Sequence, residues 1–234
     1  MFAFLRKKKI INVDAFTNNP AVFEHHSIKS SLKFIPAPLK DMTSVYNKSL
    51  SNGISVPQST IKSCPGIVDI FSIGYTIPLW SDCILETSEN EWKYAFADGH
   101  STIVSHDYMQ LPNKWQNLFH LKFISPWLIQ EKTGIKWLWI KNSWNDLDNT
   151  GLPIQPGIVE YKHQHSTHIN ILLNRFVKKY ELTAGTPLIQ LLPVTELNVN
   201  VQCHCIDNKE FEKIRLKNSQ TFFTNNYRKQ KKLC

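Results

Sequence analysis

Leu152–Glu196, LPIQPGIVEYKHQHSTHINILLNRFVKKYELTAGTPLIQLLPVTE, decides the fold, because it holds the most regular series of strand and turn signals in the chain. Pro156-Gly157 favours a tight turn, since proline presets one φ and glycine accepts a positive one. The β-branched and aliphatic run His168–Leu173 has the length of a strand. Ala184-Gly185 is a hairpin signal, and Pro187–Val194 supplies a further strand. The stretch predicts an antiparallel meander.

The rest of the chain extends this β pattern. With 234 residues, 42% hydrophobic and 20% charged, the chain suits a globular protein with a real core. Pro65 and Gly74 bracket a short helix near 65–73. A helical face in Asn208–Lys217 predicts a C-terminal helix. The predicted fold class is therefore mainly β, an antiparallel sandwich or distorted barrel with these two helices.

We predict one β-rich domain over residues 1–234. Residues 1–59 form an extended N-terminal region in which Ser44–Gln58 is an exposed loop. Residues 60–206 form the β core, and residues 207–234 form the C-terminal helix and a basic tail. Within the core, Phe123–Ile140 predicts a hairpin with a polar turn at Glu131–Gly134.

The positive charge is concentrated at the two ends of the chain. The first ten residues carry +4 and the last 26 carry +6 of a net +8, so the remainder is slightly acidic. Such ends can bind nucleic acid, or they can serve as solvated, solubilising arms. The body shows no basic patch interleaved with stacking aromatic residues, which favours the second interpretation.

Cysteine usage and hydropathy indicate a reducing compartment. Five scattered cysteines suggest no disulfide framework. The apolar runs are shorter than the roughly 20 residues of a membrane span, and the first residues lack the order of a secretory signal. We predict no membrane span and an intracellular location.

The chain contains weak candidates for a chemical site. His163, His165 and His168 could bind a transition metal, and a polar loop enriched in histidine is the alternative. The spacing matches no standard zinc site, so we predict no metal and no cofactor. No activated nucleophile and no glycine-rich phosphate loop is present, and we therefore assign no catalytic residue. The enzyme class stays open, with a non-enzymatic role favoured.

Trp137 and Trp139 alternate on a predicted strand and share one face. Aromatic faces can stack on a ligand or fill an oligomer interface, and burial in a sheet core is the alternative. We keep both residues as candidates for a ligand or interface contact.

Three segments resemble the deoxyuridine triphosphatase and dCTP deaminase family. PGIVE at 156–160, HINILLN at 168–174 and AGTPLIQLLPV at 184–194 are similar to the turn, strand and hairpin that build its β-clip. The resemblance implies β-clip-like hairpins and a deoxynucleotide site to which Asn174 and Gln190 contribute. The family's phosphate motif and nucleoside-selecting hairpin are not found, so the resemblance implies binding with or without pyrophosphatase activity.

A second resemblance covers most of residues 60–195. Cys64-Pro65-Gly66, the run Gly74–Trp80, Ser125-Pro126-Trp127, Pro156–Glu160 and Gly185–Gln190 follow one another as in an uncharacterised family encoded by tailed phages and some bacteria. Ser125 and Gly66 depart from that family's Asn and Pro. The resemblance implies a phage origin, and with it a location in the virion or the host cytoplasm.

These observations lead to two functional expectations. The first is a non-enzymatic protein that oligomerises or docks to other protein chains, such as virion proteins, as a structural component or accessory factor. The alternative is a β-clip relative that binds a deoxynucleotide.

Overall fold

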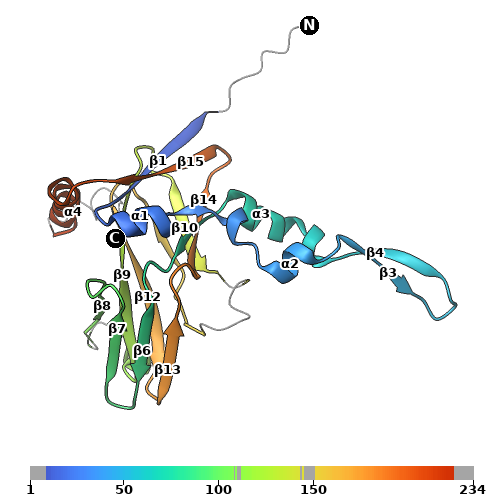
Figure 1. Cartoon of the computed structure of the whole chain (residues 1–234), viewed down its shortest axis with the longest axis horizontal. Coiled ribbons are helices and arrows are strands. Elements are labelled where there is room, and N and C mark those ends of the chain that lie inside the picture. Colours follow the sequence, from blue (N-terminus) through green and yellow to red (C-terminus); the bar gives the residue numbers. More distant parts are fainter. Residues whose placement is uncertain (1–8, 108, 110–111, 143, 145–150, 224–234) are drawn as a thin grey trace, which may run out of the picture.

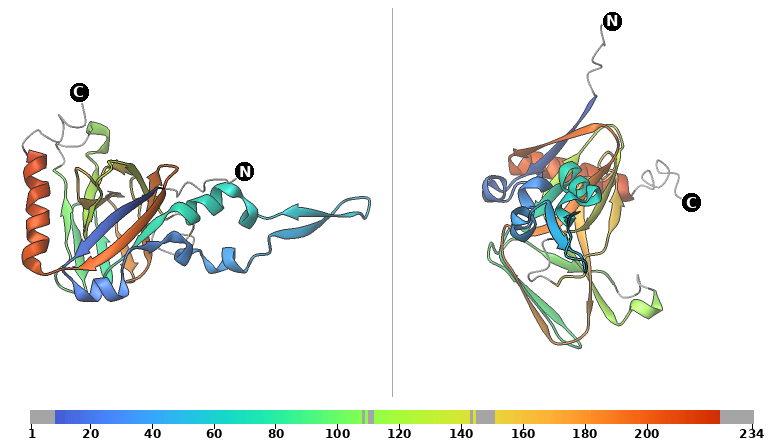
Figure 2. Two further views of the ribbon diagram at one scale, coloured as in Figure 1. Left: turned by 90° about the horizontal axis from the view of Figure 1, so that it is seen from above. Right: turned by 90° about the vertical axis from the view of Figure 1, so that its right-hand side faces the viewer.

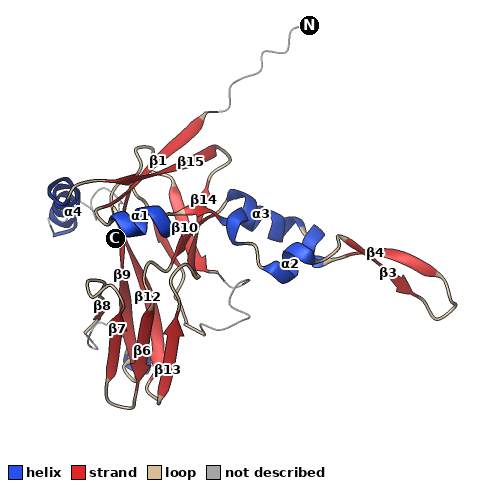
Figure 3. Ribbon diagram, in the orientation of Figure 1, coloured by secondary structure: helices blue, strands red, loops and turns tan. Residues whose placement is uncertain are grey.

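The computed structural model describes residues 9–107, 109, 112–142, 144 and 151–223. It confirms a mainly β chain with several antiparallel sheets (Figures 1 and 3). The two predicted helices are present as α3 (Pro65–Ile73) and α4 (Asn208–Phe223), and Gly74 follows the first of them. Two shorter helices, α1 (Pro20–His25) and α2 (Ala37–Asp41), lie in the N-terminal region.

The first sheet contains the first and the last strand of the described residues. Its order is β12 (Ser166–Asn174), β9 (Leu118–Gln130), β1 (Ile10–Thr17) and β15 (Asn198–Cys205), and β8 (Ile103–Ser105) also pairs with β9. β1 and β15 run parallel over their whole length, which an all-antiparallel expectation did not include. Parallel neighbours need a long connection, and here nearly the whole chain provides it.

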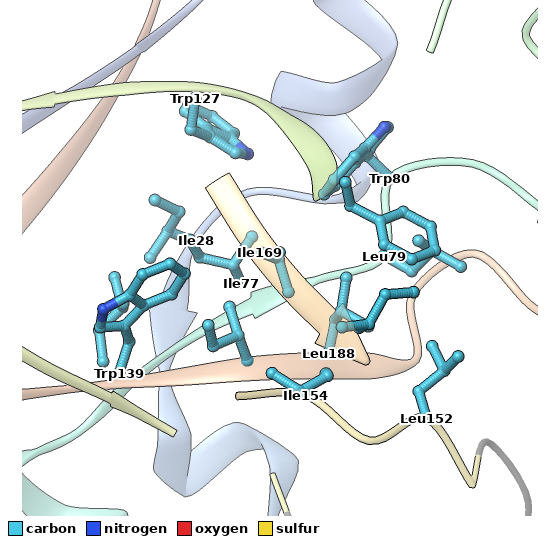
Figure 4. Close-up of a cluster of buried hydrophobic side chains, with 14 of the residues drawn as sticks. Ile28, Ile77, Leu79, Trp80, Trp127, Trp139, Leu152, Ile154, Ile169 and Leu188 are labelled. Atoms are coloured by element: carbon cyan, nitrogen blue, oxygen red, sulfur yellow. The ribbon is translucent and has the colours of Figure 1, made fainter. Parts of the chain in front are cut away.

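The second sheet orders β11 (Gly157–Val159), β10 (Lys136–Lys141), β14 (Pro187–Val194), β5 (Tyr75–Pro78) and β2 (Lys29–Ser30). A third sheet consists of β13 (Lys178–Leu182), β6 (Cys83–Thr87) and β7 (Trp92–Phe96). Side chains from all three sheets form one continuous core. Figure 4 shows part of it, where Trp127, Ile169, Ile77 and Leu188 come from four different strands.

The predicted meander is wrong in its pairing, although its strands are right. β12, β13 and β14 lie in three different sheets, and the hairpin predicted for Phe123–Ile140 is likewise split between β9 and β10. Burial explains the difference. β12 alternates buried and half-buried residues, whereas β14 buries four consecutive residues and so needs a layer on each face. The two strands, which differ in burial, lie in different sheets.

A fourth, two-stranded sheet projects from the body. β3 (Val45–Ser49) pairs with β4 (Ser55–Ser59), and Figure 2 shows this hairpin extending well beyond the three larger sheets. We call residues 42–64 the arm. The exposed loop predicted for Ser44–Gln58 is therefore wrong: it is exposed, but it is an ordered hairpin. Leu50 N donates to Ile54 O at 2.8 Å across the tip, and Gly53 there has a φ of +78°.

Among the described residues, no helix has both the length and the apolar character that crossing a membrane requires. Arg6–Lys8 and the tail beyond Phe223 lie outside the described residues, so the proposed binding of nucleic acid by the basic ends stays a prediction.

Candidate functional site

The three candidate metal-binding histidines do not form one cluster. His163 and His165 line a pocket beside β1, whereas His168 lines a different pocket under α4. Nδ1 of His165 lies 3.2 Å from Nε2 of Gln130. Within the described residues, no group of three or more His, Cys, Asp or Glu side chains could hold a metal ion.

The two candidate tryptophans belong to the core. Trp137 is 1% exposed and meets Tyr161 edge-to-face at 5.8 Å between ring centroids. Trp139 lies against Gly157, where a Cβ atom would come within 2.2 Å of the indole nitrogen. Only glycine fits this close approach. The tight turn predicted at Pro156-Gly157 is wrong, because Gly157 begins β11 and has no positive φ; the glycine instead makes room for Trp139.

Asn174 and Gln190 lie in different sheets. Asn174 is exposed at the end of β12, opposite Leu118. Gln190 is buried, and its Nε2 donates to the backbone oxygen of Ile70 in α3 at 2.8 Å. Gln190 therefore ties β14 to α3 by satisfying a carbonyl in the last turn of that helix.

The larger pocket lies between α4 and the outer face of β9 and β12, with a volume of about 810 Å³. Lys122 and His168 come from the sheet, and Arg215 and Glu212 come from α4. The loop after β7 closes one side: Asp98 accepts hydrogen bonds from the backbone nitrogens of His100 and Ser101 at 3.1 and 3.0 Å. A pocket of this size, lined by both apolar and polar side chains, can admit a small molecule.

The arm is fastened at its base by side chains that bond to backbone. Lys62 Nζ donates to Lys40 O and, at 2.9 Å, to Met42 O. Ser63 Oγ donates to Ser44 O at 2.9 Å, as does Thr60 N. The base is therefore held firmly. From Asp41 to Cys64 every residue is exposed except Val56, Thr60 and Lys62, which are half-buried.

The two outer edges of the arm differ chemically. Backbone bonds at both ends, from Leu50 N to Ile54 O and from Thr60 N to Ser44 O, set which residues face inward. Along an antiparallel ladder, the backbone N–H and C=O groups of successive residues point alternately toward the partner strand and away from it. In β3, the backbone groups of Val45, Asn47 and Ser49 point away from β4. In β4, Pro57 lies in the middle of the edge that points away from β3. Proline has no N–H to donate, so the β4 edge is blocked and the β3 edge is open.

Apolar side chains are exposed at both ends of the arm. Leu50 and Ile54 at the tip are 40% and 55% exposed, and Met42 and Ile61 at the base are 39% and 44% exposed. In β3 itself, Val45 and Tyr46 are about half exposed. Residues 42–64 contain Lys48 and Lys62 but no acidic residue. A surface that combines exposed apolar side chains with few charges suits a contact with another protein.

Comparison with known proteins adds little. No family model matches the chain, and no curated protein matches it. The chain is similar to a mutant dUTPase from phage phi11 of S. aureus, with 14% identity and a TM-score of 0.32 over 68% of this chain and 95% of that one. A mutant dUTPase of Staphylococcus bacteriophage 80alpha, with dUpNHpp, gives 14% identity and a TM-score of 0.30 over 72% and 94%. At such low TM-scores neither similarity carries an argument about this chain.

Sequence reasoning missed both the arm and the lining of the larger pocket. Asn52-Gly53 is a strong hairpin signal and would have revealed the arm. Period-two alternation in β9, which turns His120, Lys122 and Ile124 to one face, would have revealed part of the pocket wall.

Proposed function

We propose that the chain works by self-association through its arm, as a non-enzymatic structural or accessory protein. The observation that carries this proposal is the open edge of β3 on a hairpin that has no third strand within the described residues. An isolated two-stranded hairpin is at best marginally stable in water, so an exposed one of this length is best explained by a strand that completes it. Strand addition to a sheet edge is a common mode of protein recognition.

The open edge is complementary to itself. In an antiparallel pair of β3 strands centred on Asn47, Tyr46 of one copy faces Lys48 of the other, and Val45 faces Ser49. No like charges stand opposite one another, and Lys48 can lie over the ring of Tyr46. The product is a four-stranded sheet with two-fold symmetry, ordered β4-β3-β3-β4, whose outer edges both carry Pro57.

The same register brings apolar residues together. Leu50 at the tip of one arm comes opposite Ser44 of the second copy, next to Met42. The exposed apolar ends of the arm therefore extend the contact beyond the strands. A specific interface buries roughly 1,200 Å² or more in total, and a strand pair alone would fall short of that size.

Sedimentation equilibrium tests the proposal. The wild-type chain is compared with a variant in which residues 44–60 are replaced by a short Gly-Ser linker between Thr43 and Ile61. The wild type should show the mass of a dimer and the variant that of a monomer, with the same cooperative unfolding of the body. A monomeric wild type at micromolar concentration, or an equally dimeric variant, would contradict self-association through the arm.

A deoxynucleotide site built on Asn174 and Gln190, as the motif resemblance implies, has less support. Gln190 is committed to α3 and Asn174 lies in another sheet. A thermal-shift screen with deoxynucleotides tests this alternative, and a shift that disappears in Asn174→Ala would restore it.

A phage origin, and a place in the virion or the host cytoplasm, rest on the motif resemblance of residues 60–195. Mass spectrometry of purified virions would test the virion role. A fixed copy number of the chain per particle would support it, and absence from the particles would favour an accessory factor.

A further inference from the structure

The outer face of β8, β9 and β12 brings one lysine together with three histidines. His120 and Lys122 lie on this face of β9, and His168 and Asn170 lie on the same face of β12. The ring of His106, just after β8, stacks on that of His120 with 4.0 Å between centroids. We call these five residues the imidazole face.

Lys122 is the central charge of the imidazole face. It pairs across the ladder with Asn170 on one side and with Val104 on the other, and it also lines the pocket under α4. The salt bridges of the described residues do not include Lys122. A half-buried ammonium without an anionic partner is costly, because burial removes water that would otherwise stabilise its charge.

The acidic residues nearby already have partners. Asp98 accepts three hydrogen bonds, including one of 2.6 Å from Ser101 Oγ. Glu212 accepts from the Arg215 guanidinium at 2.8 Å. On the far side, Oδ1 of Asp107 accepts from the backbone nitrogen of Met109. These carboxylates are held by other donors, and within the described residues none of them forms a salt bridge with Lys122.

Two polar atoms on the imidazole face, Nδ1 of His120 and Oδ1 of Asn170, are inaccessible to solvent and make no hydrogen bond of normal geometry within the described residues. The two side chains nevertheless lie close together, because a hydrogen bond with Asn170 raises the pKa of His120 and partly offsets the effect of burial. A bound anion would therefore act mainly by neutralising Lys122.

The shifts in pKa show that these groups are partly removed from water and lie close to one another. Burial lowers the pKa of His168, and the charges of Lys122 and His106 lower it further. Burial, then His106, also lowers the pKa of His120, and burial lowers that of Lys122. The other charged or titratable groups that line the pocket with His168 are Asp98, His100, Glu212 and Arg215.

We propose that the imidazole face, together with the adjoining pocket, binds an oxyanion of phosphate size carried by a small molecule. The Lys122 ammonium and the His168 imidazolium, which both line the pocket, bind the anion from neighbouring strands, and His120 and Asn170 lie beside Lys122 on the same face of the sheet. The pocket of about 810 Å³ next to Lys122 accommodates the remainder of the ligand. This site is independent of the arm and of self-association.

Sulfate is the sharpest first probe, since its charge stays constant over the pH range in which imidazoles titrate. Binding is followed by NMR through the ring protons of His120 and His168, and by calorimetry. Affinity should rise as pH falls from about 7.5 to 5.5, because protonated imidazoles attract the anion. If the bound anion raises the pKa of an imidazole by one unit, the anion binds the protonated form about ten times more tightly than the neutral form.

Inorganic phosphate and acetate then define the ligand chemistry. Phosphate should bind like sulfate, and acetate more weakly, since it offers fewer acceptor oxygens. Stronger binding of acetate than of sulfate would replace the phosphate assignment by a carboxylate ligand.

Lys122→Met keeps the long side chain and removes the charge, so it should weaken sulfate binding at least about tenfold. His168→Gln should flatten the pH dependence. Lys93→Met is the matched control, because Lys93 is exposed on β7 and paired with Glu91. Thermal unfolding verifies that each variant folds. Unchanged ring signals of the wild type at millimolar sulfate at every pH, or equal losses in Lys122→Met and Lys93→Met, would overturn the proposal.

Discussion

The hairpins β3–β4 and β6–β7 share their local architecture and differ in their surroundings. Each joins two five-residue strands in an antiparallel ladder. β6 has β13 on its other edge and buries Cys83, Leu85 and Thr87 at every second position. In β3 every residue is exposed. The sequences explain the difference. In β6 (CILET), every second residue can face the core, whereas β3 (VYNKS) has no apolar face.

This difference teaches that hairpin formation and burial are separate properties. The Asn52-Gly53 turn and the ladder suffice to shape the arm, but only an apolar face would fold it onto the body. The β6–β7 hairpin has such a face, where Phe96 meets Trp80 and Phe123 at 6.3 and 6.0 Å between ring centroids. The arm is therefore left available to another chain.

The largest expected effect separates the two hairpins by stability. Leu85→Ala should lower the free energy of unfolding by about 2–5 kcal/mol, because Leu85 is 0% exposed and its removal leaves a cavity. Val45→Ala in the arm should change it by no more than about 0.5 kcal/mol at dilutions where the chain is monomeric. Urea unfolding followed by fluorescence measures both. Equal losses would mean that the arm packs on the body.

Next in size is the effect of Asn47→Pro on association. The substitution removes a donor from the open edge of β3 and leaves the inward ladder of the arm intact. The dimer should weaken at least about tenfold, which corresponds to roughly 1.4 kcal/mol, while the unfolding of the body stays unchanged. Sedimentation velocity over a dilution series measures the effect. Asn47→Thr, which retains the N–H, is the control and should associate like the wild type.

Pro57→Thr makes the opposite change, since it opens the second edge of the arm. With both edges able to pair, dimers should join further and produce larger assemblies that grow with concentration. Light scattering during concentration detects them. If the variant remains a dimer, Pro57 is not what closes that edge.

The smallest effect is expected on the solvent side of β6. Ile84 is 42% exposed, so Ile84→Thr should alter the free energy of unfolding by about 0.5 kcal/mol or less. The same urea experiment as for Leu85→Ala compares the two faces of one strand. A loss as large as that of Leu85→Ala would show that the outer face of β6 is covered.

Local signals in the sequence predicted several strands of the core, although they missed the two strands of the arm. The run Pro187–Val194 and the helix at 65–73 match β14 and α3, because alternation, proline and glycine act through neighbouring residues. Pairing was not predictable in the same way. The parallel pairing of Ile10 with Asn198 depends on two segments at opposite ends of the chain, and no local pattern encodes it.

The candidate sites depend even more on such distant contacts. His106, His120 and His168 are far apart in sequence and meet only because β8, β9 and β12 are neighbours. His163 and His165, which lie close together in the sequence, line another pocket. In the arm, the register of β3 with β4 determines which edge is open. That register is known only once the two strands are known to pair.

The chain's own cysteines permit a direct test of the arm. Burial raises the pKa of Cys83 to about 12 and raises that of Cys203, so both thiols react slowly and can stay. Cys64 and Cys205 are exposed. In the test protein, these two cysteines and Cys234 are each substituted by Ser. This background leaves an introduced cysteine as the main reactive thiol.

The most direct measurement compares disulfide formation by Asn47→Cys and Pro57→Cys in that background under mild oxidation. Paired strands place the two Cα atoms at position 47 about 5.5 Å apart, within reach of a disulfide. The account predicts rapid formation of a covalent dimer through Asn47→Cys and little through Pro57→Cys, independent of concentration once the dimer is populated. Equal rates for the two variants, or no dimer through position 47, would contradict it.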